Sequence, residues 1–408
     1  MELKGKYNQA KVFTDNIDSG TIEQVIELCN QEVFEHSQIR IMPDCHQGKG
    51  CVIGTTMTVE QKIVPNLVGV DIGCGVTGLV IPKDKWNIDL SDLDNAIRRC
   101  VPHGFRIHNE SKFGEDSLNE VGISLTDLYA DVDLDRAYKS LGTLGGGNHY
   151  IEVDEFKNGD KLLVVHSGSR HMGLEVAMYH QKQAIKYCTN KYEMLKKERI
   201  AAEKCCSNPL DMEDKVKEIN AMYRKPKDEL CYLEGVAKDK YLHDMDIAQR
   251  YAQANRIMIL NNILGEFWTA SETIQNTKTI IESIHNYVDL KHMILRKGSI
   301  SACKGEQVII PINMRDGAII GIGKGNEDWN YSAPHGAGRI LSRREAKEQI
   351  SIDEFKDSMK DVYSTSVNGS TLDESPQAYK PIEEIVNNIG DTVDIVEIVK
   401  PIYNFKSN

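Results

Sequence analysis

The chain has 408 residues and a net charge of −12, with 27% charged and 40% hydrophobic residues. This composition provides ample apolar material for a folded core and excludes a generally disordered chain. No stretch approaches the roughly 18 consecutive apolar residues of a membrane span, and the first residues lack the apolar segment of a secretory signal. The ten cysteines are scattered without CxxC pairs, which is typical of reduced thiols. We therefore expect a soluble protein located in the cytoplasm.

Short apolar runs bounded by glycine or proline predict a strand-rich core. In chain order they occupy residues 39–43, 52–54, 67–72, 78–81, 150–153, 162–165, 293–295, 308–311 and 318–322. Between about residues 175 and 277 the composition changes to good helix formers, and residues 241–252 place apolar groups at three- and four-residue steps. Residues 364–376 have the composition of a loop.

The helical block interrupts the strand-rich material rather than following it. This order favours an α+β fold in which residues 1–408 form one large domain with a β-rich core. The helices at about residues 175–277 are then an insertion into that domain. No internal repeat at a fixed period is present.

Seven motifs combine polar or ionisable side chains with neighbouring glycines. Glycine allows backbone N–H groups to approach a ligand, and the ionisable group supplies a lone pair or a proton. The motifs lie at residues 43–50, 69–75, 142–152, 165–170, 285–287, 296–298 and 332–339. The repetition of one pattern predicts that they converge on a single site.

Asp71 and Cys74 lie at the end of a buried apolar run. An Asp-x-x-Cys turn can direct a carboxylate and a thiolate toward one point, and a thiolate can bridge two divalent ions. The alternative is that Cys74 is a small buried apolar residue and that Asp71 caps a turn. Taken alone, the pair favours this alternative.

His149, His166 and His285 each lie beside a short apolar run, where the end of a strand presents a side chain at the edge of a sheet. Neutral imidazole is the commonest metal ligand, although a single histidine in such a place is more often hydrogen-bonded in the core. Together with Asp71 and Cys74, the three histidines form a mixed donor set. It suits Mn²⁺, Zn²⁺ or Co²⁺ better than Mg²⁺ or Ca²⁺ alone, and the sequence does not choose among the first three.

His335 stands in the segment Pro-His-Gly-Ala-Gly-Arg at 334–339, ahead of helix-forming residues. We expect a glycine loop entering a helix, whose backbone N–H groups favour phosphate, with Arg339 as a fork for two oxygens. A histidine held there could attack phosphorus and form a phosphoramidate. The alternative is a histidine in a tight turn with a solvated Arg339.

Residues 291–347 carry a net charge of +5 within an acidic chain. Such a patch either binds nucleic acid by neutralising phosphates or is a solvated surface. The chain has no GxxxxGK[ST] phosphate loop and no GxGxxG in a strand-turn-helix context, and it has no GxSxG motif. A nucleotide must therefore bind by another route, and a serine hydrolase is not favoured.

Six of these segments resemble the RtcB family of RNA-splicing ligases over essentially the whole chain. They are GVDIGCG at 69–75, GTLGGGNHYIE at 142–152, HSGSR at 166–170, HNY at 285–287, RKG at 296–298 and HGAGR at 335–339. The resemblance implies a distinctive α+β fold. It also implies an enzyme that joins RNA ends with a 3′-phosphate or 2′,3′-cyclic phosphate to 5′-hydroxyl ends, using GTP and Mn²⁺.

By the same resemblance, two manganese ions are held by Asp71, Cys74, His149, His166 and His285, with Cys74 bridging them. His335 is the guanylylated nucleophile. The guanylate contacts are Asn148, His149, Tyr150, Ile151, Glu152, His285, Asn286, Pro311, Ile312, Asn313, Met314, His335, Gly336, Ala337, Gly338 and Lys406. RNA is the expected partner, with an accessory activator protein as a further one.

One departure from the family concerns residues 311–317. Many members carry Pro-Gly-Ser-Met-Gly there, whereas this chain has Pro-Ile-Asn-Met-Arg-Asp-Gly. Ile312 replaces a permissive glycine and Arg315 adds charge, so the nucleotide preference of the pocket is open.

Two other functions fit the same residues. A metal-dependent phosphoesterase acting on RNA ends would use the same ligands without guanylylation. A non-catalytic module that binds RNA ends would need only the basic residues. GTP-independent turnover would identify the first, and binding without sealing would identify the second.

Overall fold

Two antiparallel-rich sheets form the centre of the molecule. The computed structural model describes residues 1–48, 50–111, 114–205 and 225–407. The six-stranded sheet has the order β1 (Glu2–Lys4), β2 (Gln9–Val12), β3 (Ile39–His46), β4 (Ile53–Thr58), β12 (Ile294–Lys297) and β11 (Tyr287–Asp289). Only β2 and β3 pair in parallel in this sheet; the other pairs are antiparallel.

The second sheet has seven strands, and all its neighbouring pairs are antiparallel. Its order is β10 (Ile280–Ile284), β6 (Gly75–Ile81), β8 (Lys161–Ser167), β7 (Tyr150–Glu155), β17 (Val393–Lys406), β15 (Gly317–Gly323) and β14 (Gln307–Asn313). Two short pairs complete the strands, β13 (Ser299–Ser301) with β16 (Ser332–Pro334) and β5 (Lys62–Ile63) with β9 (Leu233–Glu234).

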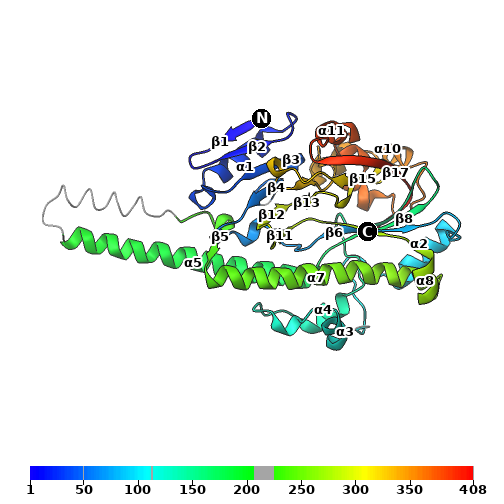
Figure 1. Cartoon of the computed structure of the whole chain (residues 1–408), viewed down its shortest axis with the longest axis horizontal. Helices are drawn as coiled ribbons and strands as arrows, with labels where there is room; N and C mark the ends of the chain where they lie inside the picture. Colours follow the sequence, from blue (N-terminus) through cyan, green and yellow to red (C-terminus); the bar gives the residue numbers. More distant parts are fainter. Residues whose placement is uncertain (49, 112–113, 206–224, 408) are drawn as a thin grey trace.

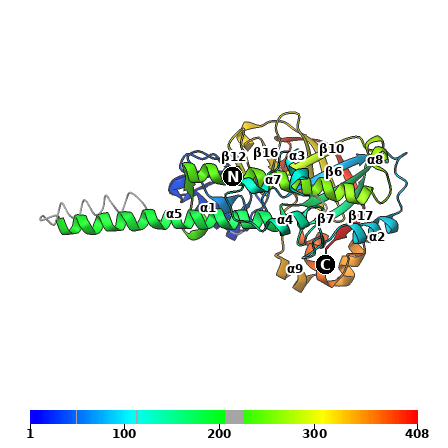
Figure 2. The same cartoon turned by 90° about the horizontal axis from the view of Figure 1, so that it is seen from below.

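The helices pack around these sheets (Figure 1). They are α1 (Ser19–Cys29), α2 (Leu90–Cys100), α3 (Glu115–Glu120), α4 (Leu134–Ser140), α5 (Arg170–Cys205), α7 (Val236–Leu264), α8 (Ala270–Asn276), α9 (Arg343–Gln349), α10 (Ile352–Ser358) and α11 (Ile382–Asn388). The outer part of α5 extends beyond the rest of the molecule in both views (Figure 2). Among the described residues, no helix combines the length and apolarity needed to cross a membrane.

Alternation along β7 and β8 buries both faces of the seven-stranded sheet. Ile151 and Val153 on β7 pack with residues of α2 and α7 in one core cluster. Tyr150 and Val164 point the other way and pack against residues of β14 and β15. Since successive side chains of a strand point to opposite faces, these two apolar layers follow from the sequence of each strand.

The seven-stranded sheet curls so that its two edge strands meet. The backbone N–H of Ile309 on β14 donates to Ser283 Oγ on β10 at 2.9 Å. This contact brings the 311–317 hairpin, which joins β14 to β15, to the same side of the molecule as the end of β10.

Helix α7 joins the cores of the two sheets. Tyr241, Met245 and Tyr251 in its first half belong to the cluster under the six-stranded sheet, whereas Ile259 and Ile263 belong to the cluster under the seven-stranded sheet. A helix with buried residues along most of its length is expected to lie inside a protein rather than on its surface. It therefore fixes the two sheets relative to each other.

The α+β prediction is confirmed, and most predicted strands are present. The helices α5, α7 and α8 lie between β8 and β10, which belong to one sheet. The assignment of 1–408 to one domain with a helical insertion at about 175–277 stays a prediction. Two expectations are wrong. Residues 67–72 form the end of a 3₁₀ helix and a turn, and the predicted loop 364–376 contains a 3₁₀ helix at Gly369–Glu374.

Candidate active site

Four neighbouring strands of the seven-stranded sheet bring the five predicted metal ligands to one edge. Cys74 directly precedes β6 and His149 directly precedes β7, while His166 lies near the end of β8 and His285 directly follows β10. In an antiparallel sheet the start of one strand lies beside the end of the next, so these four positions coincide. Asp71 joins them from the turn before Cys74, whose backbone N–H donates to the Asp71 carbonyl.

The donor atoms form two overlapping groups. In the first, His149 Nε2 lies 3.0 Å from Asp71 Oδ2 and 3.5 Å from Cys74 Sγ. In the second, His166 Nε2 lies 3.3 Å from Cys74 Sγ and 3.3 Å from His285 Nε2. In each group the ligand atoms all lie within 4.8 Å of one another. Cys74 belongs to both groups, which is the arrangement expected of a bridging ligand.

The backbone contact of His149 sets the tautomer of its ring. His149 Nδ1 lies 2.8 Å from the Leu144 carbonyl oxygen and therefore carries a hydrogen, so Nε2 of the neutral ring directs its lone pair toward Asp71 Oδ2, 3.0 Å away. A proton on Nε2 or a metal cation near both atoms joins them. A cysteine sulfur, a carboxylate and imidazole nitrogens that converge in this way form a donor set that fits a divalent metal.

Burial and charge set the protonation of the cluster. Burial lowers the pKa of His166 and of His285 well below the ordinary value, and neighbouring imidazoles lower both further, so both rings are neutral. Burial alone would raise the pKa of Asp71, but hydrogen bonds and charge from His149 bring it to about 2. Burial and the Asp71 charge raise the pKa of the Cys74 thiol. Neutral imidazoles beside an ionised carboxylate are the forms that bind metal.

Two buried polar residues of α7 hold the ligand-bearing loops in place. Arg256 is fully buried, and its guanidinium donates to the carbonyl oxygens of Gly73 and Ser167 at 2.8 and 3.0 Å. It also pairs with Glu282 of β10 at 2.9 Å. Asn255 accepts from the N–H of Gly142 and donates to the carbonyl oxygen of Gly168. Outer groups of this kind fix the orientation of metal ligands.

Sequence reasoning did not identify Asn255 and Arg256. A signal was nevertheless present, because the two residues follow the apolar steps of 241–252 and so fall on the face of α7 that should be apolar. Polar side chains at core positions need hydrogen-bond partners, and here the partners are the loops of the site.

His335 lies beside this cluster and is oriented by Asp44 of β3. The ring centroids of His335 and His285 are 4.9 Å apart. The fully buried Asp44 places Oδ2 2.7 Å from His335 Nδ1, and the same oxygen accepts from the backbone N–H groups of His335 and Gly336. A carboxylate only accepts, so Nδ1 carries the hydrogen and Nε2 keeps a lone pair. This is the arrangement of an activated nucleophile.

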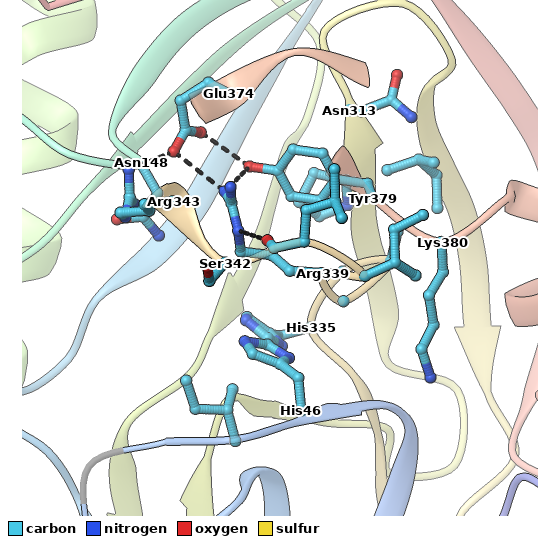
Figure 3. A pocket seen from close by; sticks show the side chains of 18 of the residues that line it. His46, Asn148, Asn313, His335, Arg339, Ser342, Arg343, Glu374, Tyr379 and Lys380 are labelled. Carbon is cyan, nitrogen blue, oxygen red and sulfur yellow. Dashed lines mark hydrogen bonds and ion pairs between the residues drawn. The ribbon is translucent and has the colours of Figure 1, made fainter. Parts of the chain in front are cut away.

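Asp44 lies within the motif at residues 43–50, but the sequence pattern did not indicate its role. Two residues later, His46 Nδ1 donates a hydrogen bond to the Asp44 carbonyl oxygen. Burial lowers the pKa of His46. His46 and His335 both line the cavity (Figure 3). The segment 43–50 thus contributes to the site through its orienting carboxylate.

A cavity of about 960 Å³ opens onto His335 and reaches the metal cluster at His166. Its lining includes most of the predicted guanylate contacts. These are Asn148, Tyr150, Glu152, Pro311, Ile312, Asn313, Met314, Gly336, Ala337, Gly338 and Lys406. It also includes residues that the sequence did not identify, namely His46, Arg343, Glu374, Tyr379, Lys380 and Asn404.

Four predicted nucleotide contacts do not line the cavity. The side chain of Ile151 is fully buried on the opposite face of β7, because strand alternation separates it from Tyr150 and Glu152. His149 and His285 belong to the metal cluster instead. Asn286 connects two loops, since its Nδ2 donates to the Asp71 carbonyl and its Oδ1 accepts from the Gly298 N–H.

Three cations of the cavity are paired with one buried glutamate. Glu374 Oε1 accepts from Arg343 at 2.6 Å and from Arg339 at 3.4 Å, while its Oε2 pairs with Lys406 and accepts from the Tyr379 hydroxyl. Figure 3 shows Glu374, Tyr379 and Arg339 in this network. Burial would raise the pKa of Glu374, but the charges of Lys406 and Arg343 bring it to about 2.

The predicted basic patch at 291–347 is therefore largely compensated in space. Besides the Glu374 network, Lys347 lies 3.3 Å from Asp373, and the fully buried Arg296 lies 3.3 Å from Asp289. The glycine loop leads into a helix as expected, because α9 (Arg343–Gln349) follows it with Ser342 as its N-cap.

The 311–317 segment is a tight hairpin rather than an open loop. Ile312 is buried in a core cluster and Met314 packs in another. Asn313 Oδ1 accepts from the backbone N–H groups of Arg315 and Asp316. The Arg315 side chain pairs with Asp316 and does not line the cavity. The extra charge of this segment is thus neutralised outside the pocket.

Comparisons with known proteins agree with this geometry. A family model described as tRNA-splicing ligase RtcB matches residues 24–127 and 125–407. The chain is 29% identical over 399 residues to RNA-splicing ligase RtcB of Escherichia coli K12, which covers 91% of this chain and 90% of that protein. It is 27% identical over 436 residues to tRNA-splicing ligase RtcB of Nanoarchaeum equitans, covering 85% and 83%. An RNA-splicing ligase RtcB homolog of Entamoeba histolytica is 26% identical over 420 residues, covering 85% and 75%.

Proposed function

The chain belongs to the tRNA-splicing ligase RtcB family, and from this premise we propose that it is an RNA ligase that works through a guanylylated His335. The substrates are an RNA end with a 3′-phosphate or a 2′,3′-cyclic phosphate, an RNA end with a 5′-hydroxyl, and GTP. The observation that carries the proposal is the position of His335, held by Asp44 at the meeting point of the cavity and the metal cluster.

Asp71, Cys74, His149, His166 and His285 would hold two divalent ions, which we propose to be Mn²⁺. Bound there, they would neutralise phosphate oxygens and stabilise the charge of the transition state. The rest of the mechanism belongs to side chains of the chain itself.

In the first step His335 Nε2 attacks the α-phosphorus of GTP. A nitrogen–phosphorus bond forms, the bond to the β-phosphate oxygen breaks, and pyrophosphate leaves. Asp44 accepts the Nδ1 hydrogen throughout and stabilises the positive charge that develops on the ring. The Lys406, Arg339 and Arg343 side chains provide positive charge along the cavity wall for the anionic nucleotide.

In the second step an oxygen of the RNA 3′-phosphate attacks the phosphorus on His335, the nitrogen–phosphorus bond breaks, and GMP is transferred to the RNA. A cyclic phosphate must first be opened by water. The 5′-hydroxyl of the other RNA end then attacks the activated 3′-phosphorus, GMP leaves, and a 3′,5′-phosphodiester forms. The hydroxyl proton passes to solvent or to a basic group.

The test is incubation of the protein with Mn²⁺ and GTP labelled at the α-phosphate. The wild type is expected to form an acid-labile protein adduct that His335→Ala lacks and that His36→Ala, a change at an exposed histidine, retains. Sealing of paired RNA ends with GTP, with ATP and without nucleotide completes the test. No adduct on the wild type, or turnover without a nucleotide, would contradict the mechanism and favour the phosphoesterase. The cytoplasmic location stays a prediction from the composition of the chain, and the accessory activator stays a prediction from the family resemblance.

A further inference from the structure

A loop beside the metal cluster presents a fully exposed aromatic side chain. Phe105 has a relative exposure of 104%, the highest among the large apolar residues that the structure describes. Single exposed apolar residues are common, so exposure alone says little. Three further features indicate a function for the exposed ring. They are the anchoring of the loop, its charge and its position relative to the reacting groups.

The backbone just before Phe105 is fixed to the loop that carries the proposed metal ligand His149. The Gly104 N–H donates to the Gly145 carbonyl at 2.8 Å, and the Leu144 N–H donates to the Pro102 carbonyl at 2.9 Å. Leu144 in turn receives the hydrogen bond of His149 Nδ1. Phe105 therefore projects from a segment held at a constant position beside His149.

The loop also touches the C-terminal end of β17, which forms a wall of the nucleotide cavity. A methyl group added at Gly146 would lie 3.6 Å from Gly104 Cα and 3.9 Å from Ser407 Oγ. The His103 ring packs edge-on against Phe405 at 5.1 Å between centroids. The loop thus lies between the metal-binding loop and the strand that ends in Lys406.

The charge next to Phe105 is positive and is not compensated by an acid. Within the described residues, the side chain of Arg106 contacts the His103 ring and no carboxylate. The surroundings of Arg106 differ from those of Arg339, Arg343 and Lys406 in the cavity, whose charges are all paired with Glu374. An exposed ring next to an unpaired guanidinium combines the two elements that bind single-stranded nucleic acid, a stacking surface and a phosphate contact.

The position of Phe105 relative to His335 indicates which of the two RNA strands it would contact. His335 adjoins the half of the metal cluster that contains His285, whereas Phe105 adjoins the half that contains His149. In the sealing step the attacking and leaving oxygens lie on opposite sides of the phosphorus. GMP leaves on the side of His335, so the 5′-hydroxyl must arrive from the other side.

We propose that Phe105 stacks against a base near the end of the RNA strand that carries the 5′-hydroxyl, and that Arg106 contacts a phosphate of the same strand. This inference rests on the proposed ligase function. A single ring without apolar neighbours suits a base, which stacks on one face, better than it suits a protein surface. Stacking of this kind contributes roughly 1–3 kcal/mol per base, which corresponds to at least about a fivefold change in affinity.

The test measures binding of a 3′-labelled oligoribonucleotide with a 5′-hydroxyl to the full chain without GTP, by fluorescence anisotropy. Phe105→Ala should weaken binding about fivefold or more, and Phe105→Trp should restore it. Tyr192→Ala, a change at an exposed aromatic residue on the projecting helix α5, should have no effect. Arg106→Ala should reduce the salt dependence of binding by about one ion.

An abasic series locates the contact. Single abasic sites are placed in turn at the first nucleotides of the 5′ end. One of these sites should weaken RNA binding to the wild type, and the same site should not weaken RNA binding to Phe105→Ala. Equal affinity of wild type and Phe105→Ala, or abasic effects that persist in the variant, would overturn the proposal. Binding of a protein to the Phe105 surface that is lost in Phe105→Ala, while RNA binding is unchanged, would also overturn the proposal.

Guanylylation separates this inference from the proposed function. All these variants should form the His335 adduct as the wild type does, since Phe105 and Arg106 do not line the nucleotide cavity. Absence of the adduct in the wild type would contradict the ligase mechanism, while binding without GTP would still decide the role of Phe105. Loss of the adduct in Phe105→Ala alone would indicate a disturbed metal loop and would also overturn the proposal.

Discussion

The proposed metal site and the proposed nucleotide cavity adjoin each other but differ in how their charges are paired. In the metal site, His149 Nε2 and Asp71 Oδ2 lie 3.0 Å apart, close enough to share a proton or a cation. In the cavity, Lys406, Arg339 and Arg343 are already paired with Glu374. The proposed metal site therefore presents donor atoms to a cation. In the cavity, Glu374 neutralises the three cations until an anionic ligand competes for them. The variants below test this difference.

The largest effect is expected from Cys74→Ala. Loss of the shared donor removes one ligand from both groups, so sealing should fall by about a thousandfold or more. Titration with Mn²⁺ followed by electron paramagnetic resonance should show weaker binding at two sites. Cys29→Ala, at a buried cysteine remote from the site, is the matched control. Loss of only one bound ion would show that Cys74 does not bridge.

Glu374→Gln tests the balanced charge of the cavity through acid stability. The folded-state pKa of about 2 lies below the ordinary value of 4.5, so ionised Glu374 stabilises the fold above pH 4.5. That contribution, about 3 kcal/mol, is lost as the pH falls from 4.5 toward 2. Urea unfolding should therefore show a weaker pH dependence between pH 6 and pH 3 in the variant. Glu348→Gln, at an exposed glutamate, should behave as the wild type.

Arg256→Met removes the support beneath the cluster without touching a ligand. Because the guanidinium holds Gly73 and Ser167, its loss should weaken Mn²⁺ binding by about 10- to 100-fold. Calorimetric titration measures this change. Arg250→Met, on the same helix but half-exposed, should leave the affinity unchanged. An unchanged affinity in Arg256→Met would confine the arginine to a role in stability.

Arg315→Ala should have the smallest effect. Its side chain pairs with Asp316 outside the cavity, so the KM for GTP in adduct formation should change by less than about twofold, in keeping with the small energy of surface pairs. A larger change would mean that the 311–317 hairpin opens when the nucleotide binds.

The two regions also differ in how far the sequence predicts them. Among the proposed metal ligands, Cys74 and His149 directly precede strands, His285 directly follows one and His166 lies near the end of another. The apolar runs and neighbouring glycines of the sequence therefore predicted that these residues meet. The partner of His335 could not be found in this way, because Asp44 is separated from it by 291 residues. The same holds for Glu374, which neutralises cations that the local sequence presents as a basic patch.

The wrong prediction of a strand has a local cause. Residues 67–72 are mostly apolar, as in a strand, but Gly69 and Gly73 adopt positive φ values of 101° and 69° and turn the chain toward Cys74, which leaves Val70 exposed. The predicted helix after the His335 loop is present, and a capping box between Ser342 and Glu345 fixes the start of α9. In residues 67–72, by contrast, a backbone preference outweighed the hydrophobic pattern.

Asp44, which orients His335, lies on β3 of the six-stranded sheet, whereas the proposed metal ligands lie at strand ends of the seven-stranded sheet. Any sliding of one sheet over the other would change the separation between imidazole and cations by a similar amount. Helix α7, 29 residues long and packed against both cores, opposes such sliding. A small molecule that wedged between α7 and either sheet would therefore inhibit the protein without entering the cavity.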